Sequence, residues 1–372
     1  MDRRRSKLIS RVLGRFEIWL FIMPMDDDIL TLLKEKGDQM ARLAQRGVIL
    51  QPGAIGDCIL TLPLAEFMKD SLQLGGIDII GHTEYIGILP GRTCVDSVRS
   101  MDSINLHRMF VEKSVFDLAD GDPLINAFAD YAWIVTFLGE PYSNFEQNLI
   151  FTANCSHSSE VITLSMKPPE GYSNHLTDYY RQQLVDECSL SSETQQIERG
   201  TLLIRATETD ANKGRELLTE IQVDSSQKLV VIQPGSGGLH KCWHPDNFLT
   251  VAEELRSKGV DVVFLLGPVE QARFSNTTIN DIKRVAKCLT DLSLMQVVEL
   301  LSCSDGFLGN DSGITHLAAG MGVRTLVVFG PTNPAVYKPV GPAVTAFAYS
   351  GDAFAEKPST ALQQDVINVL MG

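Results

Sequence analysis

The sequence predicts an α/β protein of two domains, each built on a mainly parallel sheet. Short apolar runs of strand length alternate with stretches of helical periodicity, which is the pattern of βαβ units. The chain has 372 residues, too many for one ordinary hydrophobic core and about right for two. With 44% apolar and 21% charged residues, it lacks the compositional bias of disordered or fibrous chains.

Residues 1–46 form an N-terminal extension with a separate charge pattern. Residues 1–15 hold six Lys or Arg against one Asp, a local charge of 6 − 1 = +5 in a chain of net charge −14. Apolar residues recur at helical spacing from Leu8 to Met23, so residues 1–24 predict a basic amphipathic helix that lies on anionic lipid. The alternative is an unanchored tail upstream of a later start at Met23 or Met25.

The N-terminal extension also indicates where in the cell the protein is expected. Its longest uninterrupted apolar run, residues 18–25, is eight residues long, far short of the roughly 20 that span a bilayer. Arg11, Arg15 and Glu17 interrupt the N-terminal segment, whereas a secretory signal needs an apolar centre without charges. We therefore expect a cytoplasmic protein, with the basic helix as its peripheral contact at the inner membrane.

Residues 47–200 are expected to form the first domain. Its strands are predicted at apolar runs, namely residues 48–50, 77–80, 133–138 and 161–164. A glycine turn, residues 51–57, follows the first run and leads into a helix whose start Pro63 leaves uncertain. Residues 173–188 have helical spacing, and the polar stretch 189–200 is the expected crossing to the next domain.

Residues 201–350 are expected to form the second domain. Apolar runs predict its strands at residues 229–232, 262–266, 307–308 and 325–329. Helical spacing predicts helices that begin at Pro245, Leu294 and Ile314. Residues 351–372 complete the chain with a helix from about residue 359 to 370, which has the room to cross back onto the first domain.

Composition also excludes classes of partner. Thirty-two Lys and Arg against 46 Asp and Glu produce a field that repels phosphate backbones, so we expect no nucleic acid partner. Seven scattered cysteines without a C-x-x-C pair predict neither a disulfide frame nor a zinc site. The acidic run 26–28 lies in the extension, and His240 and His244 have no third ligand nearby, so we expect no metal and no cofactor.

One candidate anion site follows the strand at residues 307–308. Asp311 and Ser312 come directly after it and begin a helix, so free backbone N–H groups and the positive helix end are expected there. Gly309 and Gly313 would let a diphosphate approach the backbone, and His316 would point from the same helical face. An ordinary helix cap with a surface histidine explains these residues as well.

A second candidate follows the strand at residues 229–232. The turn around Ser236 leads to Lys241, an ammonium that could neutralise a leaving phosphate. The turn is too long for a dinucleotide-binding dehydrogenase, and no acidic residue ends the next strand. Glu270 lies just beyond that strand and is placed to accept hydrogen bonds from ribose hydroxyls or to cap the next helix.

Asp57 closes the first glycine turn, beside Gly53 and Gly56. A carboxylate at the lip of a domain, next to backbone that cannot crowd a substrate, suits a general base for an acceptor hydroxyl. Capping of the helix that follows is the other explanation.

Together these segments resemble glycosyltransferase family 9, the ADP-heptose:lipopolysaccharide heptosyltransferases and their relatives. The resemblance rests on G-A-I-G-D at residues 53–57, P-G-S with K-C-W at residues 234–243, G-P-V-E at residues 267–270 and G-N-D-S-G-I-T-H-L-A-A at residues 309–319, continuing to G-P-T at residues 330–332. It covers roughly residues 47–345. His244 precedes Pro245 where the family more often places Pro directly after Trp.

The resemblance implies a GT-B architecture, in which two Rossmann-like domains face a central cleft. It also implies metal-independent, inverting transfer of a sugar, in particular heptose from ADP-heptose, to a glycan or a lipid-linked lipopolysaccharide core. Residue by residue, it implies Asp57 as catalytic base on the acceptor-side loop with Gly53 and Gly56, and Lys241 as the cation that stabilises the leaving diphosphate. Donor-binding residues would be Ser236, Lys241, Glu270, Asp311, Ser312, Gly313 and His316.

Two other functions fit the same residues. A GT-B-shaped nucleotide-sugar epimerase would release an altered sugar with no acceptor added. A non-catalytic sugar-nucleotide binding protein would keep the site without the chemistry, although Asp57 and Lys241 together argue against it.

Overall fold

The computed structural model describes residues 45–190, 200–223, 227–349, 354–356, 358 and 360–371. Residues Gln45–Gly372 belong to one compact unit. The predicted basic helix of residues 1–24 and its lipid contact lie outside the described residues, as do most of the polar crossing at 189–200 and the cluster at 26–28.

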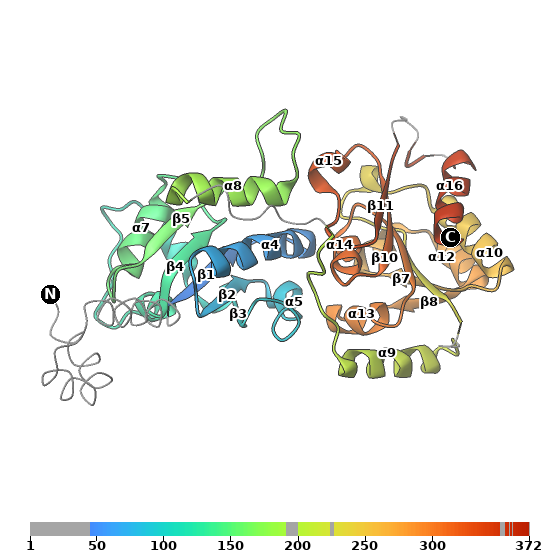
Figure 1. Ribbon diagram of the computed structural model, residues 1–372, viewed down its shortest axis with the longest axis horizontal. Helices are drawn as coiled ribbons and strands as arrows, with labels where there is room; N and C mark the ends of the chain where they lie inside the picture. Colours follow the sequence, from blue (N-terminus) through green and yellow to red (C-terminus); the bar gives the residue numbers. More distant parts are fainter. Residues whose placement is uncertain are drawn as a thin grey trace, which may run out of the picture. The chain divides into compact units, whose positions relative to one another are not determined.

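The first half of this unit is built on a five-stranded parallel sheet (Figure 1). Its strand order is β3-β2-β1-β4-β5. The strands are β1 Arg46–Gln51, β2 Gly76–Gly81, β3 Ser97–Ser100, β4 Tyr131–Thr136 and β5 Glu160–Thr163. Its helices are α4 Ile55–Ser71, α5 Thr83–Ile86, α6 Pro123–Phe128, α7 Asn144–Ala153 and α8 Leu176–Cys188, with short 3₁₀ turns at Met101–Ser103 and Leu106–Phe110.

The second half is built on a six-stranded parallel sheet of order β11-β10-β9-β6-β7-β8. The strands are β6 Leu229–Gln233, β7 Asp261–Leu266, β8 Lys287–Thr290, β9 Gly306–Asn310, β10 Arg324–Phe329 and β11 Val344–Ala348. The helices are α9 Glu208–Glu220, α10 Pro245–Ser257, α11 Pro268–Arg273, α12 Asn276–Val285, α13 Leu294–Leu301, α14 Gly313–Gly320, α15 Pro334–Tyr337 and α16 Thr360–Met371, with a 3₁₀ turn at Leu239–Lys241.

Both sheets reverse their strand order beside the first strand. The chain runs outward from β1 through β2 to β3 and then returns to β4 on the other side; β6, β7, β8 and β9 repeat this course. In open α/β sheets, ligands bind beyond the carboxyl ends of the strands at such a reversal. The two places to search are therefore the ends of β1 and β4, and the ends of β6 and β9.

The strands form where the sequence has continuous apolar runs because helices cover both faces of a parallel sheet. Val48, Ile49 and Leu50 in β1 are fully buried, and β7 is buried from its second residue onward. Helix α4 begins at Ile55, inside the segment 51–57 predicted as a glycine turn, and continues through Pro63 to its end. Pro63 therefore lies inside this helix and does not delay its start.

The last helix differs from the expectation that it could cross back onto the first domain. α16 packs against α10 in the second half, where its buried Val366, Ile367 and Leu370 join the apolar cluster of that half. Gln363 Nε2 donates to Asn247 Oδ1 of α10 at 2.8 Å. The apolar stripe of α16 is thus covered within the second half.

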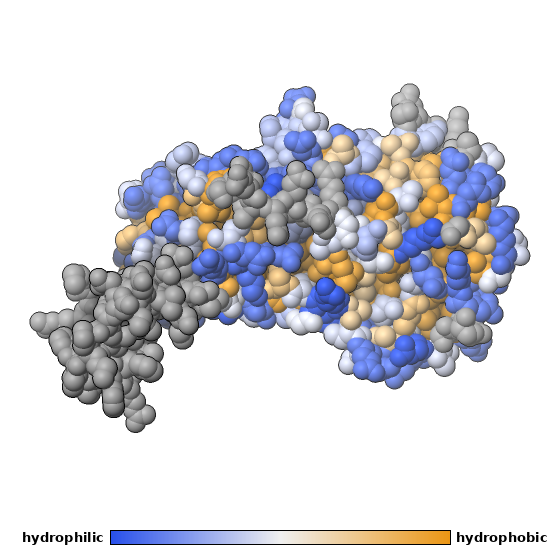
Figure 2. All heavy atoms as spheres, viewed as in Figure 1, coloured by the Kyte–Doolittle hydropathy of each residue, from blue (hydrophilic) through white to orange (hydrophobic). Residues whose placement is uncertain are grey.

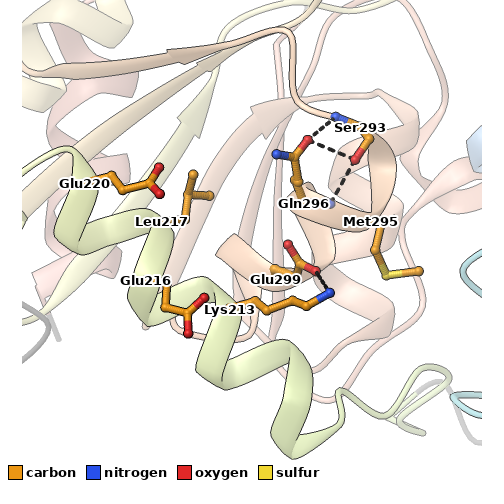
Figure 3. A pocket seen from close by; sticks show the side chains of 8 residues that line it. All are labelled: Lys213, Glu216, Leu217, Glu220, Ser293, Met295, Gln296 and Glu299. Atoms are coloured by element: carbon orange, nitrogen blue, oxygen red, sulfur yellow. Dashed lines mark hydrogen bonds and ion pairs between the residues drawn. The ribbon is translucent and has the colours of Figure 1, made fainter.

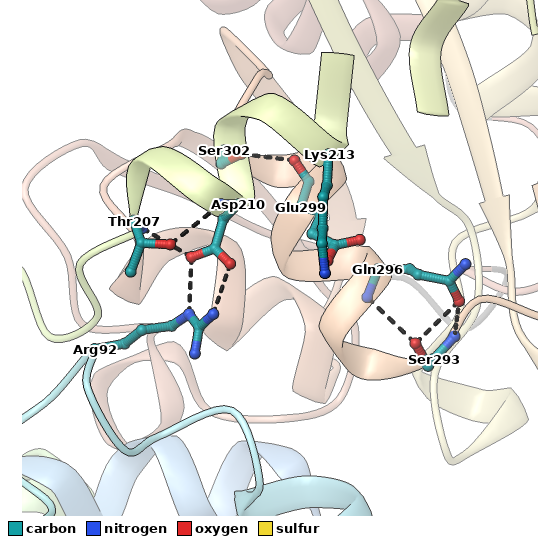
Figure 4. Close-up of polar contacts among 8 residues, drawn as sticks. All are labelled: Arg92, Thr207, Asp210, Lys213, Ser293, Gln296, Glu299 and Ser302. Carbon is teal, nitrogen blue, oxygen red and sulfur yellow. Dashed lines mark hydrogen bonds and ion pairs between the residues drawn. The ribbon is translucent and has the colours of Figure 1, made fainter. Parts of the chain in front are cut away.

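Several contacts join the two halves. α4 packs against α14, and the backbone N–H group of Arg205 donates to the carbonyl of Arg92 at 2.8 Å. Arg92 of the first half forms an ion pair with Asp210 of α9 (Figure 4). These contacts hold the carboxyl ends of β1 and β9 in a defined relation.

Helix α9 presents a hydrophilic outer surface (Figure 2). Its Asn212, Arg215 and Glu216 are exposed, whereas Gly214 and Leu218 are buried on the side that packs against α13. In the part of the chain that the structure describes, every helix is too short or too polar to cross a membrane.

Candidate functional site

Three of the predicted donor-binding residues come together at the end of β9. The Lys241 Nζ atom lies 2.9 Å from Asp311 Oδ2, and His316 Nε2 lies 3.6 Å from Asp311 Oδ1. Asp311 and His316 are buried, while the Lys241 side chain is one-third exposed. The sequence separates Lys241 from Asp311 by 70 positions, and the β6 and β9 pairing brings them together.

The charge of Asp311 is set by these neighbours. Burial alone would raise the pKa of its carboxyl group, but the hydrogen bond and charge of His316, followed by those of Lys241, lower it to about 2. Asp311 is therefore an ionised carboxylate at neutral pH. It holds the ammonium of Lys241 at the mouth of the β6–β9 reversal.

The loop that carries Lys241 is fastened to the end of β9. Ser236 Oγ donates to the Asp311 carbonyl at 2.6 Å. Asn310, fully buried, accepts from Trp243 N at 2.8 Å and donates from Nδ2 to the Pro234 carbonyl at 2.7 Å. Sequence reasoning gave Asn310 no role, although its place between a buried strand and Asp311 was the available signal.

Glu270 is placed behind this loop. It is 3% exposed, and its Oε2 accepts from Gly267 N at 2.8 Å while its Oε1 accepts from Gln233 Nε2 at 2.5 Å. A Cβ atom at Gly235 would overlap the Glu270 carboxylate. The structure thus gives Glu270 a capping and loop-supporting role, and any hydrogen bond to a ribose would share oxygens that already accept.

Ser312 and Gly313 begin α14. Ser312 Oγ accepts from Thr315 N at 3.3 Å as the helix cap and donates to Gln233 Oε1 at 2.8 Å. A Cβ atom at Gly313 would lie 2.8 Å from the Ile55 Cβ of α4. The space that Gly313 leaves is therefore filled by the first half of the unit.

The acceptor-side residues meet this cluster. A Cβ atom at Gly56 would lie 3.3 Å from His316 Cδ2, so the first turns of α4 and α14 are in contact. Asp57 stands in that first turn of α4, partly exposed, with Oδ2 accepting from Ala54 N at 3.0 Å. Gly53 lies against the Asp57 side chain, because a Cβ atom there would be 2.6 Å from Asp57 Cβ.

This arrangement suits an anion with a hydroxyl nearby. Two helix N-termini, whose first N–H groups have no partner within their own helix and which carry a partial positive charge, lie in contact here. Lys241 adds a full positive charge, and Asp57 adds a carboxylate on the opposite helix. The chemistry available is stabilisation of a phosphate leaving group together with removal of a proton.

The described residues also contain a groove outside this cluster, but no group placed to hold a metal ion. No group of three or more His, Cys, Asp or Glu side chains among them is placed to hold a metal ion. A groove between α9 and α13 is lined by Lys213, Glu216, Leu217, Glu220, Ser293, Met295, Gln296 and Glu299 (Figure 3). It contains none of the residues that the sequence singled out.

The profile of glycosyltransferase family 9 (heptosyltransferase) matches residues 172–363, just over half of the chain. The chain belongs to glycosyltransferase family 9. The family 9 match includes the Lys241–Asp311 cluster and begins after Asp57, so the acceptor-side assignment rests on the motif and geometry alone.

Individual family 9 proteins are more distant. Lipopolysaccharide heptosyltransferase 3 of Escherichia coli is 27% identical over 119 residues, which cover 30% of this chain and 34% of that protein. Lipopolysaccharide heptosyltransferase 1 of Pseudomonas aeruginosa is 28% identical over 125 residues, 34% of each chain. The matched stretches therefore span about a third of the length of these curated relatives.

Solved structures match over a larger share. The family 9 glycosyl transferase of Veillonella parvula superposes with a TM-score of 0.64 at 16% identity and covers 88% of this chain and 98% of its own. E. coli ADP-heptose lps heptosyltransferase II has a TM-score of 0.64 at 15% identity with the same coverage. These likenesses establish the fold, and the expectation of two Rossmann-like sheets in a GT-B architecture is confirmed.

Proposed function

We propose that this family 9 protein is an inverting, metal-independent glycosyltransferase that moves a heptose from ADP-heptose to a hydroxyl of a lipopolysaccharide core. The observation that carries the proposal is the contact between the first turns of α4 and α14. It supports a site that has the Asp57 carboxylate on one side and, on the other, Lys241 and the start of α14, where the diphosphate would bind.

The donor half supplies stabilisation of the leaving group. As the bond between the anomeric carbon and the diphosphate oxygen breaks, negative charge grows on the diphosphate. The Lys241 ammonium and the first N–H groups of α14 would receive that charge. Lys241 is paired with Asp311 at 2.9 Å beforehand, so the donor diphosphate would share or replace this partner.

The acceptor half supplies the base. The acceptor hydroxyl attacks the anomeric carbon from the face opposite the leaving diphosphate, which inverts the configuration. Its proton passes to the Asp57 carboxylate as the new C–O bond forms. Asp311, an ionised carboxylate, would accept hydrogen bonds from hydroxyls of the bound sugar.

A transfer assay with purified ADP-heptose and a heptose-deficient lipopolysaccharide core tests the proposal. Asp57→Asn should keep donor binding and lose transfer by about 10²–10⁴-fold. Asp70→Asn, an exposed carboxylate on the same helix, is the matched control and should transfer at the normal rate. An undiminished rate in Asp57→Asn would remove Asp57 as base.

The assay also separates the alternatives. Release of an altered nucleotide sugar or free nucleotide without acceptor would indicate the epimerase, and binding without turnover across many acceptors would indicate a binding protein. The proposed cytoplasmic location with inner-membrane contact through residues 1–24 has its own test. Flotation on anionic liposomes should be lost when the chain starts at Met25, and equal flotation would reject the contact.

A further inference from the structure

The chain contains one six-residue pattern twice. Residues 48–53 read V-I-L-Q-P-G, and residues 230–235 read V-V-I-Q-P-G. The first pattern lies on β1 and the second on β6, each the strand at which its sheet reverses order. Gln51 and Gln233 therefore end equivalent strands, at the two places where open α/β sheets bind ligands.

Gln233 joins two loops of the donor half. It is 7% exposed; its Nε2 donates to Glu270 Oε1 at 2.5 Å, and its Oε1 accepts from Ser312 Oγ at 2.8 Å. Glu270 follows β7 and Ser312 follows β9, the strands on either side of β6. Both ends of one amide are used, so its orientation and the spacing of the two loops are fixed together.

Gln51 also uses both ends of its amide, in the acceptor half, but its partners lie within one segment of the chain. It is fully buried; its Oε1 accepts from Gly53 N at 2.8 Å, and its Nε2 donates to Thr61 Oγ1 at 2.7 Å. Thr61 Oγ1 in turn donates to the Asp57 carbonyl at 2.8 Å. This amide therefore ties the glycine turn to the first turn of α4, which carries Asp57.

We propose that Gln51 and Gln233 are paired positioning residues of the transfer reaction. Gln233 holds Ser312 and Glu270 in place for the nucleotide diphosphate donor, and Gln51 holds Asp57 in place for the attacking hydroxyl. The inference rests on the proposed function. A buried amide that is hydrogen-bonded at both ends fixes the positions of its partners, because leaving either partner without a hydrogen bond costs free energy.

The two glutamines should differ in kinetics. In the full chain, Gln233→Leu should weaken ADP binding and raise the KM for ADP-heptose by about tenfold or more, with kcat at saturating donor within about threefold. Gln51→Leu should leave the ADP Kd unchanged and lower kcat by about tenfold or more. Each variant removes the same buried amide from an equivalent strand and so controls for the other.

Exchanging the side chains of Gln233 and Glu270 keeps the net charge, and it distinguishes a positioning role from a general loss of folding. Gln233→Glu alone sets two carboxylates together, and Glu270→Gln alone sets two amides together, so each should weaken ADP binding about tenfold. The double variant reverses donor and acceptor, keeps the bonds to Ser312 and Gly267, and should restore the ADP Kd to within about threefold of wild type. If the double variant folds and still fails to bind, the positioning role is wrong.

The outcomes are separable from those of the proposed function. ADP calorimetry tests the Gln233 half without any transfer. If the wild type binds ADP but transfers to no acceptor, the transferase proposal is refuted. Loss of ADP binding in Gln233→Leu would still support the Gln233 role. If the wild type transfers normally and both leucine variants show the same fall in kcat and rise in KM, the paired roles are wrong and the proposed function stands. The same holds if neither variant changes kcat or KM.

Discussion

Replacing Asp210 with Asn should weaken the junction between the two halves. Arg92 Nε donates to Asp210 Oδ2 at 2.8 Å and its Nη2 to Oδ1 at 2.6 Å, in the fork arrangement seen in Figure 4. The Asp210 side chain is 2% exposed and that of Arg92 15%. Asp210 also accepts from Thr207 N at 2.8 Å and so caps α9.

The size of the effect follows from the pKa of Asp210. The Arg92 hydrogen bonds, opposed by burial, lower this pKa from 3.8 to about 2. This lowering of the pKa corresponds to roughly 2 kcal/mol of preference for the ionised form. Because solvent reaches the Arg92 edge and screens the pair, we expect Asp210→Asn to lower the free energy of unfolding by about 1–2 kcal/mol at pH 7.

The pH dependence makes the prediction specific. A carboxyl group with a lowered folded-state pKa contributes its full stability above its unfolded pKa, near 3.9, and loses it as pH falls through about 2. The gap between wild type and Asp210→Asn in urea unfolding should therefore fall to about half between pH 7 and pH 3. Asp281→Asn, which removes an exposed pair with Arg284, should change stability by less than about 0.5 kcal/mol. A gap for Asp210→Asn that is constant or grows toward pH 3 would refute the reasoning.

Three further substitutions test other parts of the structure. Gly235→Ala places a methyl group on the Glu270 carboxylate, so ADP affinity measured by calorimetry should fall about tenfold or more; wild-type affinity would contradict the close approach. Lys241→Met removes the counter-charge of Asp311, raises the pKa of that carboxyl group and should lower kcat about 100-fold, whereas an unchanged kcat would exclude Lys241 from stabilising the leaving group. Ile367→Ala opens a cavity under α16 and should cost about 2–4 kcal/mol in thermal unfolding, and a loss below about 0.5 kcal/mol would argue against its packing.

The sequence predicted the central strands well because their burial on both faces leaves continuous apolar runs, as in β1 and β7. It did not predict β3, whose S-V-R-S sequence at the sheet edge is mostly polar and partly exposed. Such a strand forms through its pairing with β2, 16 residues or more away along the chain, and pairing of this kind leaves no local pattern.

The sequence predicted the parts of the candidate site in which a motif marks the start of a helix. It did not predict the parts in which a side chain bonds to a loop far away along the chain. Asp311 and Ser312 were found because a cap and a glycine follow a buried strand. Gln233 and Asn310 were missed because their partners lie 37 to 79 positions away, so nothing near them in the sequence shows what they bond. The side of the protein on which α16 packs was undetermined for the same reason.

The proposed donor is an anion and the chain is acidic, so donor binding would have to rely on local sources of positive potential. The net charge of −14 opposes the approach of a diphosphate, and Asp311 places one more negative charge beside Lys241. Attraction must then come from the N–H groups and dipoles at the starts of α4 and α14, which are fixed before the ligand arrives. Fixed dipoles act only over short distances, so the proposal depends on the contact at Gly56 and Gly313, where two residues without side chains let the starts of α4 and α14 lie against each other.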